Sequence, residues 1–86
     1  MDDETLKVYG YVISSSYRER SVKSLNESDK IPTDLAEDIG IRKNHISKVL
    51  RELKECGVAE CINEDKRKNR VYRLTSKGED VAKLID

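Results

Sequence analysis

Polar side chains recur at helical spacing along residues 42–55. Asn44, Lys48 and Arg51 follow one another at intervals of four and three residues. In an α-helix this spacing places all three side chains on one face. The amide of asparagine matches the edge of adenine, whereas lysine and arginine match guanine or a phosphate. The spacing therefore predicts a helix over 42–55 whose outer face can hydrogen-bond to the bases and backbone of a nucleic acid.

The other side of the same segment is apolar. Its stripe consists of Ile46, Val49, Leu50 and Leu53. These positions follow the i, i+3, i+4, i+7 pattern of a helix that buries one face against a core, so the polar face must point outward. The candidate contact residues on and beside the polar face are Arg42, Lys43, Asn44, His45, Ser47, Lys48 and Arg51.

A shorter helix is predicted immediately before this one. Pro32 is a start signal, Leu35 and Ile39 form an apolar pair, and Gly40 is suited to the left-handed conformation that ends a helix. The short link after Gly40 forces a sharp angle, so we predict a helix-turn-helix over 32–55. An antiparallel helix pair in a small bundle is the alternative, and the turn glycine together with the basic outer face argues against it.

Two short segments rich in β-formers follow the second helix. Residues 58–62 (VAECI) and 71–74 (VYRL) are separated by a polar loop at 63–70. Two strands with a charged loop after such a helix describe a β-hairpin wing over 58–74. The loop adds four candidate contacts with nucleic acid, which are Lys66, Arg67, Lys68 and Arg70.

Residues 57–78, GVAECINEDKRKNRVYRLTSKG, resemble the wing of MarR-type and related ArsR-like winged-helix transcriptional regulators, in particular small archaeal members. The matching positions are Asp65, Arg67, Arg70, Leu74, Thr75 and Gly78. The resemblance implies that Arg67 enters the minor groove of DNA and that Asp65 orients it. It extends upstream through a helix containing Ser16, Tyr17, Arg18, Val22 and Leu25, and so covers residues 16–85.

The departures from those families limit what the resemblance implies. MarR proteins have long terminal helices that build a dimer and a ligand pocket, but this sequence has only short segments at its ends. We therefore expect no small-molecule effector. Metal-sensing relatives carry a cysteine motif in the second helix of the helix-turn-helix, and residues 42–55 contain no cysteine. Accordingly, neither a metal nor a cofactor is expected.

The remaining segments are expected to support the motif. Apolar residues at 4–14 suggest a helix, although a strand fits them as well. Ser16 and Glu19 form a predicted capping box, and Thr75 is expected to cap a final helix. The predicted fold class is α+β, mainly α: a three-helix core, a two-stranded wing, an N-terminal segment and a C-terminal helix, in one domain spanning 1–86.

Charge is unevenly distributed along the chain. The sequence has 17 basic and 17 acidic residues, so its formal net charge is zero. Residues 41–54 hold five basic residues and one acidic residue, which gives +4, and residues 63–73 hold five and two, which gives +3. The rest of the chain therefore carries −7. The predicted contact surfaces are basic and the remainder is acidic, as expected for a protein that binds a polyanion.

No enzymatic chemistry is predicted. The sequence has no glycine-rich phosphate loop, no nucleophile motif and a single histidine. Cys56 and Cys61 are interpreted as reduced, partly buried thiols, with a redox sensor as the less favoured alternative. No apolar run is long enough to span a bilayer, and no signal-peptide pattern is present, so a cytoplasmic protein is expected.

Two functional hypotheses follow. The first is a sequence-specific regulator of transcription that binds double-stranded DNA through residues 42–55 and the wing loop. The second is a winged-helix module that binds a protein partner in a transcription or other nucleic-acid complex. RNA binding is disfavoured because the four tyrosines are mostly expected in the core, which leaves no stacking platform. A homodimer through the N- and C-terminal segments would allow two half-sites to be read.

Overall fold

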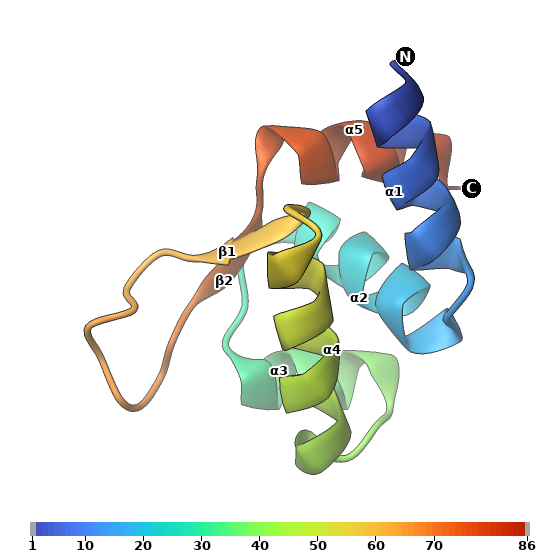
Figure 1. Cartoon of the computed structure of the whole chain (residues 1–86). Helices are drawn as coiled ribbons and strands as arrows, with labels where there is room; N and C mark the ends of the chain where they lie inside the picture. The colour runs from blue at the N-terminus through green and yellow to red at the C-terminus, as the bar shows by residue number, and fades with distance from the viewer. Residues whose placement is uncertain (1, 86) are drawn as a thin grey trace.

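The computed structural model describes residues 2–85 and contains five helices and one two-stranded antiparallel sheet within that range (Figure 1). This mainly helical α+β architecture matches the predicted fold class. No described helix is both long enough and apolar enough to cross a membrane. In chain order the elements are α1 (Asp3–Ile13), α2 (Ser16–Glu27), α3 (Pro32–Ile39), α4 (Lys43–Glu55), β1 (Ala59–Cys61), β2 (Tyr72–Leu74) and α5 (Ser76–Leu84).

The hydrophobic core is formed by residues of all five helices together with Val58 and Ala59 at the start of the wing. The whole predicted apolar stripe of α4 is buried, and Leu53 is completely inaccessible. Leu35 of α3 and Val22 of α2 are also completely buried and belong to the same cluster. Burial of these side chains removes apolar surface from water and fixes the rotation of α4 about its axis. The polar face of α4 is therefore held toward solvent.

The turn of the helix-turn-helix has the predicted geometry. Pro32 occupies the first position of α3, where a missing N–H is tolerated. Gly40 ends α3 in the left-handed conformation with φ of 76°, and its N–H donates to the carbonyl of Ala36 at 2.9 Å. Arg42 is the N-cap of α4, so the predicted start of that helix is correct to within one residue.

The wing strands are shorter than predicted. β1 and β2 pair antiparallel, with Ala59 opposite Leu74 and Cys61 opposite Tyr72. The N–H of Val58 donates to the carbonyl of Leu53 at 2.9 Å. This hydrogen bond belongs to the end of α4, so Val58 does not extend β1. Tyr72 also exchanges two backbone hydrogen bonds with Lys30, at 2.9 and 3.1 Å. The loop before α3 is thereby attached to the wing, which the sequence did not reveal.

The N-terminal segment, left open between helix and strand, is the helix α1. The side chain of Asp2 accepts a hydrogen bond from the N–H of Thr5 at 2.8 Å and starts this helix. The predicted capping box of Ser16 and Glu19 is wrong, because Ser15 is the N-cap of α2 and accepts from the N–H of Arg18, which places an arginine instead of Glu19 at the third helical position. Ser15 and Ser16 carry the same hydroxyl group, so the sequence alone does not distinguish them as N-caps. Ser15 is the N-cap because its backbone is extended, as the backbone of an N-cap residue typically is.

The last helix, α5, packs against α1 and is capped as predicted (Figure 1). The hydroxyl of Thr75 accepts a hydrogen bond from the N–H of Gly78 at 3.1 Å and donates to the carbonyl of Gly57 at 2.5 Å. Val81 and Ala82 are buried, whereas Leu84 and Ile85 are only partly covered.

Candidate nucleic-acid interface

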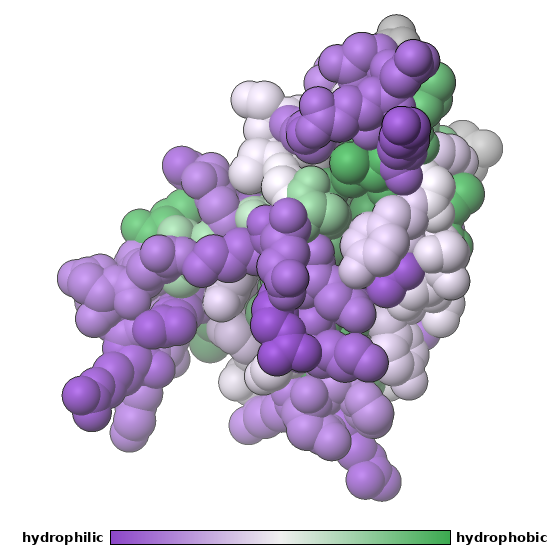
Figure 2. All heavy atoms as spheres, viewed as in Figure 1, coloured by the Kyte–Doolittle hydropathy of each residue, from purple (hydrophilic) through white to green (hydrophobic). Residues whose placement is uncertain are grey.

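The outer face of α4 is a continuous exposed polar surface. Asn44, Lys48 and Arg51 are all exposed, and the buried stripe lies on the opposite side of the helix. The other residues predicted to flank this face are exposed as well; they are Arg42, Lys43, His45 and Ser47. Figure 2, drawn from the same side as Figure 1, shows hydrophilic side chains covering α4 and the wing.

Few interactions within the protein involve the polar face of α4. The Nε of Arg51 lies 3.8 Å from Oε1 of Glu55, and both side chains are about 70 % exposed, at 69 % and 71 %. An exposed i, i+4 pair of this kind contributes only about 0.3–0.5 kcal/mol, so Arg51 can exchange Glu55 for another partner. Within residues 2–85, Asn44 and Lys48 make no side-chain hydrogen bond or ion pair. These side chains are available to a ligand.

An aromatic pair borders the first turn of α4. The rings of Tyr17 and His45 lie 5.9 Å apart and are tilted by 53°. Tyr17 and Tyr11 are 37 % and 41 % exposed, which corrects the expectation that the tyrosines are mostly in the core. Both tyrosines lie on the outer faces of α1 and α2. The inner faces of these helices are occupied by Thr5, Val12 and Val22.

The wing loop is organised by its own hydrogen bonds. The guanidinium of Arg70 donates to the carbonyls of Lys66 and Glu64, at 2.6 and 3.1 Å. The side chain of Asn63 accepts from the N–H of Val71 at 2.7 Å and donates to the carbonyl of Asn69 at 3.2 Å. Arg70, predicted as a nucleic-acid contact, is thus exposed and simultaneously engaged in holding the loop.

The tip of the wing carries the remaining predicted contacts. Lys66, Arg67 and Lys68 are exposed and project from the braced loop. Asp65 and Arg67 share no hydrogen bond or ion pair within the described chain, so the expected orienting contact is not formed in this structure. Arg67 and Lys68 instead line a cavity of about 320 Å³ between the wing and the start of α3, which also includes Pro32.

Salt bridges neutralise the base of the wing. The ammonium of Lys54 is hydrogen-bonded to the carboxylate of Glu64, and this contact raises the pKa of Lys54 and lowers the pKa of Glu64. Arg73 pairs with Glu60 at 3.1 Å. Together with the exposed Arg51–Glu55 pair, three basic residues counted in the two segments are therefore paired. The unpaired positive charge is concentrated at the start of α4 and at the wing tip.

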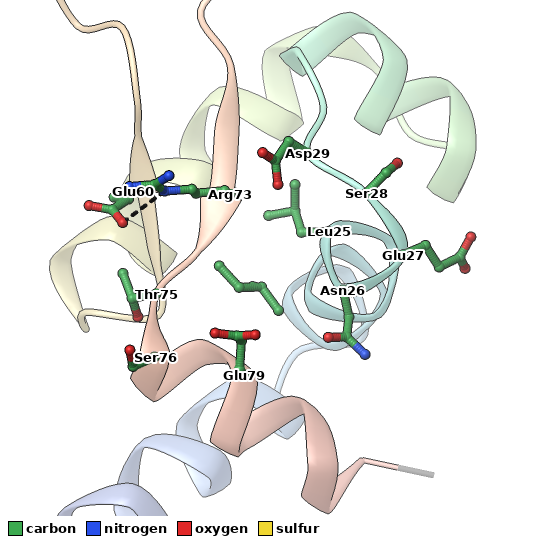
Figure 3. Close-up of a pocket in the computed structure, with 11 residues that line it drawn as sticks. Leu25, Asn26, Glu27, Ser28, Asp29, Glu60, Arg73, Thr75, Ser76 and Glu79 are labelled. Atoms are coloured by element: carbon green, nitrogen blue, oxygen red, sulfur yellow. Dashed lines mark hydrogen bonds and ion pairs between the residues drawn. The ribbon is translucent and has the colours of Figure 1, made fainter.

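Acidic residues gather at a different surface. A cavity of about 470 Å³ is lined by the end of α2, the wing strands and the start of α5, and no residue of α4 lines it. Figure 3 shows Asp29 and Glu79 reaching toward this cavity from different elements, with the Glu60–Arg73 pair at its border. Glu27 also lines it. As predicted, acidic side chains therefore gather on a surface apart from the basic face of α4.

The two cysteines are positioned as predicted and are reduced. Cys56 is the C-cap of α4, Cys61 is the last residue of β1, and both are partly buried. Burial raises the pKa of the Cys56 thiol above its ordinary value. Within residues 2–85, no three His, Cys, Asp or Glu side chains come together in an arrangement that could hold a metal ion.

No protein-family model and no curated protein matches this chain, whereas several solved structures do. The transcriptional repressor BigR from Xylella fastidiosa is 29 % identical, with a TM-score of 0.76 over 95 % of this chain and 76 % of BigR. A MarR-family transcriptional regulator from Silicibacter pomeroyi is 13 % identical, with a TM-score of 0.73 over 96 % of this chain and 62 % of that protein.

The adhesin competence repressor AdcR from Streptococcus pyogenes is 17 % identical, with a TM-score of 0.73 over 81 % of this chain. The matched region spans about half of AdcR, 53 % of its length. All three comparisons combine low sequence identity with a TM-score above 0.7 over most of this chain, so they show a shared fold. The chain has the winged helix-turn-helix fold, and it shares this fold with solved structures of transcriptional repressors and MarR-family regulators.

Proposed function

We propose that this protein is a sequence-specific regulator of transcription that binds double-stranded DNA. In this proposal α4 lies in the major groove, and the wing loop at 63–70 contacts the backbone and the adjacent minor groove. The observation that carries the proposal is the face of α4: Asn44, Lys48 and Arg51 are exposed together, with the unpaired cations of the wing tip beside them. The structural relatives described as transcriptional repressors and regulators support it.

The dimensions of α4 fit this role. A helix with its side chains is about 10–12 Å wide, and the major groove of B-DNA is about 12 Å wide. Its 13 residues are enough to cross the groove with several side chains in reach of base edges. The residues near its start are the ones that the recognition helix of a helix-turn-helix places against bases. Asn44 is assigned to a base on this ground, and Arg51 is assigned to a base because it lies two turns further along the same exposed face.

The wing is assigned a different task. Lys66, Arg67 and Lys68 are exposed cations on a loop, and such residues bind phosphates without regard to sequence. Counterions released by these contacts would supply affinity for any duplex, whereas α4 would supply the preference for one sequence. The acidic surface lined by Glu27, Asp29 and Glu79 would face away from the duplex.

This division of labour can be tested with two variants. We expect Arg51→Ala to weaken binding to a selected sequence more than to random duplex DNA, by about 1–3 kcal/mol. Lys68→Ala should weaken binding to the selected and the random duplex equally. It should also reduce the slope of log affinity against log salt by about 0.9, which corresponds to one phosphate contact. The measurement is fluorescence anisotropy over a salt series, after selection of a preferred duplex from a random pool.

Lys83→Gln provides the control, because Lys83 is exposed on α5 and its removal changes the net charge by the same amount as Lys68→Ala. It should bind as the wild type does. Equal losses of Arg51→Ala on selected and random DNA would contradict the assignment of α4. If wild-type protein does not bind any duplex at low salt, the proposal fails and the protein-interaction hypothesis takes its place.

The second part of the proposal is a homodimer formed through the terminal segments. Leu6 and Ile13 are 47 % and 39 % exposed and lie two turns apart on α1, hence on the same face. Gly10 lies between them, and no heavy atom is found within 4 Å of where its Cβ would be. In Figure 2 hydrophobic side chains gather around α1. A two-fold dimer would read two half-sites about one helical turn apart.

A further inference from the structure

The first turn of α2 carries an arginine that has no role in the fold. Arg20 is exposed, and its guanidinium carbon lies 5.8 Å from the centre of the Tyr17 ring. Its Nη2 reaches the helix-turn-helix turn, 3.7 Å from where a Cβ would stand on Gly40. Tyr17 in turn contacts His45 of α4. The guanidinium is thereby held beside the recognition helix.

A neighbouring arginine shows the contrast. The side chain of Arg18 is only 12 % exposed and donates to the carbonyl of Tyr11, to Ser14 and to Glu52, so it is used entirely within the protein. Arg20 forms no ion pair within residues 2–85. The carboxylate of Asp38 lines the same shallow cavity as Arg20, but it accepts a hydrogen bond from Ser24. Glu27 lines this cavity too, but within residues 2–85 neither carboxylate forms an ion pair with Arg20, so the guanidinium has no such partner to release when it binds a phosphate.

We propose that Arg20, held by Tyr17, binds a phosphate of the DNA backbone on the side of the recognition helix that lies away from the wing. In Figure 1, α4 stands between the wing on one side and the first turn of α2 on the other. A helix in the major groove has one phosphate backbone on each side of it. The wing serves one backbone, and Arg20 serves the other.

Arginine is suited to this contact because its planar fork pairs with two phosphate oxygens while its flat face rests on an aromatic ring. The contact rests on the proposed function, since it requires α4 to lie in the groove. It adds to that proposal a backbone anchor from outside both the helix-turn-helix and the wing. Neither the spacing of α4 nor the resemblance of the wing pointed to α2 as a contact element.

The test uses the complete chain and a random-sequence duplex of about two helical turns. Arg20→Gln keeps a polar, unbranched side chain but removes the guanidinium and its charge. Loss of one phosphate contact should reduce the slope of log affinity against log salt by about 0.9. The ratio of the wild-type affinity to the variant affinity should then fall by about 3.5-fold between about 50 and about 200 mM salt. Arg20→Lys should retain most of the slope.

Lys83→Gln is the matched control, because it removes one exposed positive charge from α5. The proposal is overturned if Arg20→Gln gives the same slope as this control while Lys68→Ala lowers it; DNA binding by the wing would then stand without the α2 contact. Absence of binding by the wild type overturns this proposal and the proposed function together. Thermal unfolding of Arg20→Gln should match that of the wild type, since the side chain is exposed.

Tyr17 is a positioning residue in this scheme, and a double-mutant cycle separates its role from that of a plain surface residue. Tyr17→Leu should lower the affinity for random duplex in the presence of Arg20. In the Arg20→Gln background the same change should have a smaller effect, because the side chain that it supports is already gone. Fully additive losses would assign Tyr17 an independent contact and would overturn the proposed support of Arg20.

Discussion

A single glycine allows α5 to pack against the start of the wing. A Cβ on Gly78 would stand 2.1 Å from the carbonyl oxygen of Val58, and that oxygen is fixed by the N–H of Thr75 at 2.9 Å. Because the opposing atom belongs to the backbone, it cannot rotate away. We expect Gly78→Ala to lower the free energy of unfolding by about 1–3 kcal/mol.

Urea unfolding followed by circular dichroism measures this change. Ser76→Ala serves as the control, since Ser76 is exposed in the same helix and its substitution should change stability by less than about 0.5 kcal/mol. Equal unfolding midpoints for Gly78→Ala and wild type would contradict the predicted close approach.

The thiol of Cys56 should react more slowly than an ordinary cysteine. Its pKa is raised by burial, so the thiolate fraction is lower than that of an unperturbed thiol at every pH up to and beyond the ordinary pKa. In a Cys61→Ser variant, alkylation by iodoacetamide should remain slow at neutral pH and accelerate only above the ordinary thiol pKa. The same protein unfolded in urea is the reference. A fast reaction in the folded state would revive the redox-sensor interpretation.

At the scale of elements, the wing is a braced loop. Two carbonyls accept from Arg70, and the amide of Asn63 bridges Asn69 and Val71. Asn69 has a positive φ of 57°, a conformation that asparagine adopts more readily than most residues. The brace limits the positions that Lys66, Arg67 and Lys68 can take, which reduces the entropy lost when they bind.

The two roles of Arg70 predict opposite outcomes for a conservative variant. If Arg70 acts mainly by holding the loop, Arg70→Lys should lose nearly as much DNA affinity as Arg70→Gln, because an ammonium cannot reproduce the forked pair of hydrogen bonds. Hydrogen exchange of the amides at 64–70 should become faster in both variants. An Arg70→Lys variant with wild-type affinity would assign Arg70 to phosphate binding instead.

At the scale of the whole molecule, the exposed face of α1 predicts an assembly. We expect the wild type to sediment as a dimer at tens of micromolar, a concentration at which a weak self-association becomes populated. Ile13→Glu should sediment as a monomer, because it places a carboxylate in the apolar contact. Lys7→Gln, an exposed position on the same helix with the same change in net charge, should remain dimeric. A monomeric wild type would remove the dimer from the proposed function.

The sequence by itself determined the elements that have strong local signals. The stripe on α4, Pro32 and Gly40 at the ends of α3, and Thr75 at the start of α5 each depend on neighbouring residues only. For the same reason the exposed face of α4 followed from its buried face. These features are fixed by helix periodicity and by the hydrogen-bonding needs of helix ends, which tertiary context seldom overrides when several of them agree.

Tertiary structure alone decided which charges remain available. Lys54 and Arg73 count as basic residues in the sequence, but carboxylates 10 and 13 residues away pair with them, and Arg70 is engaged by two carbonyls of its own loop. Nothing in the sequence around Arg20 and Tyr17 indicates a contact with DNA, and the two residues gain this significance only because α2 packs beside α4. Ion pairs and ring contacts join residues that folding brings together, so composition counts the charges and the fold determines which of them can face DNA.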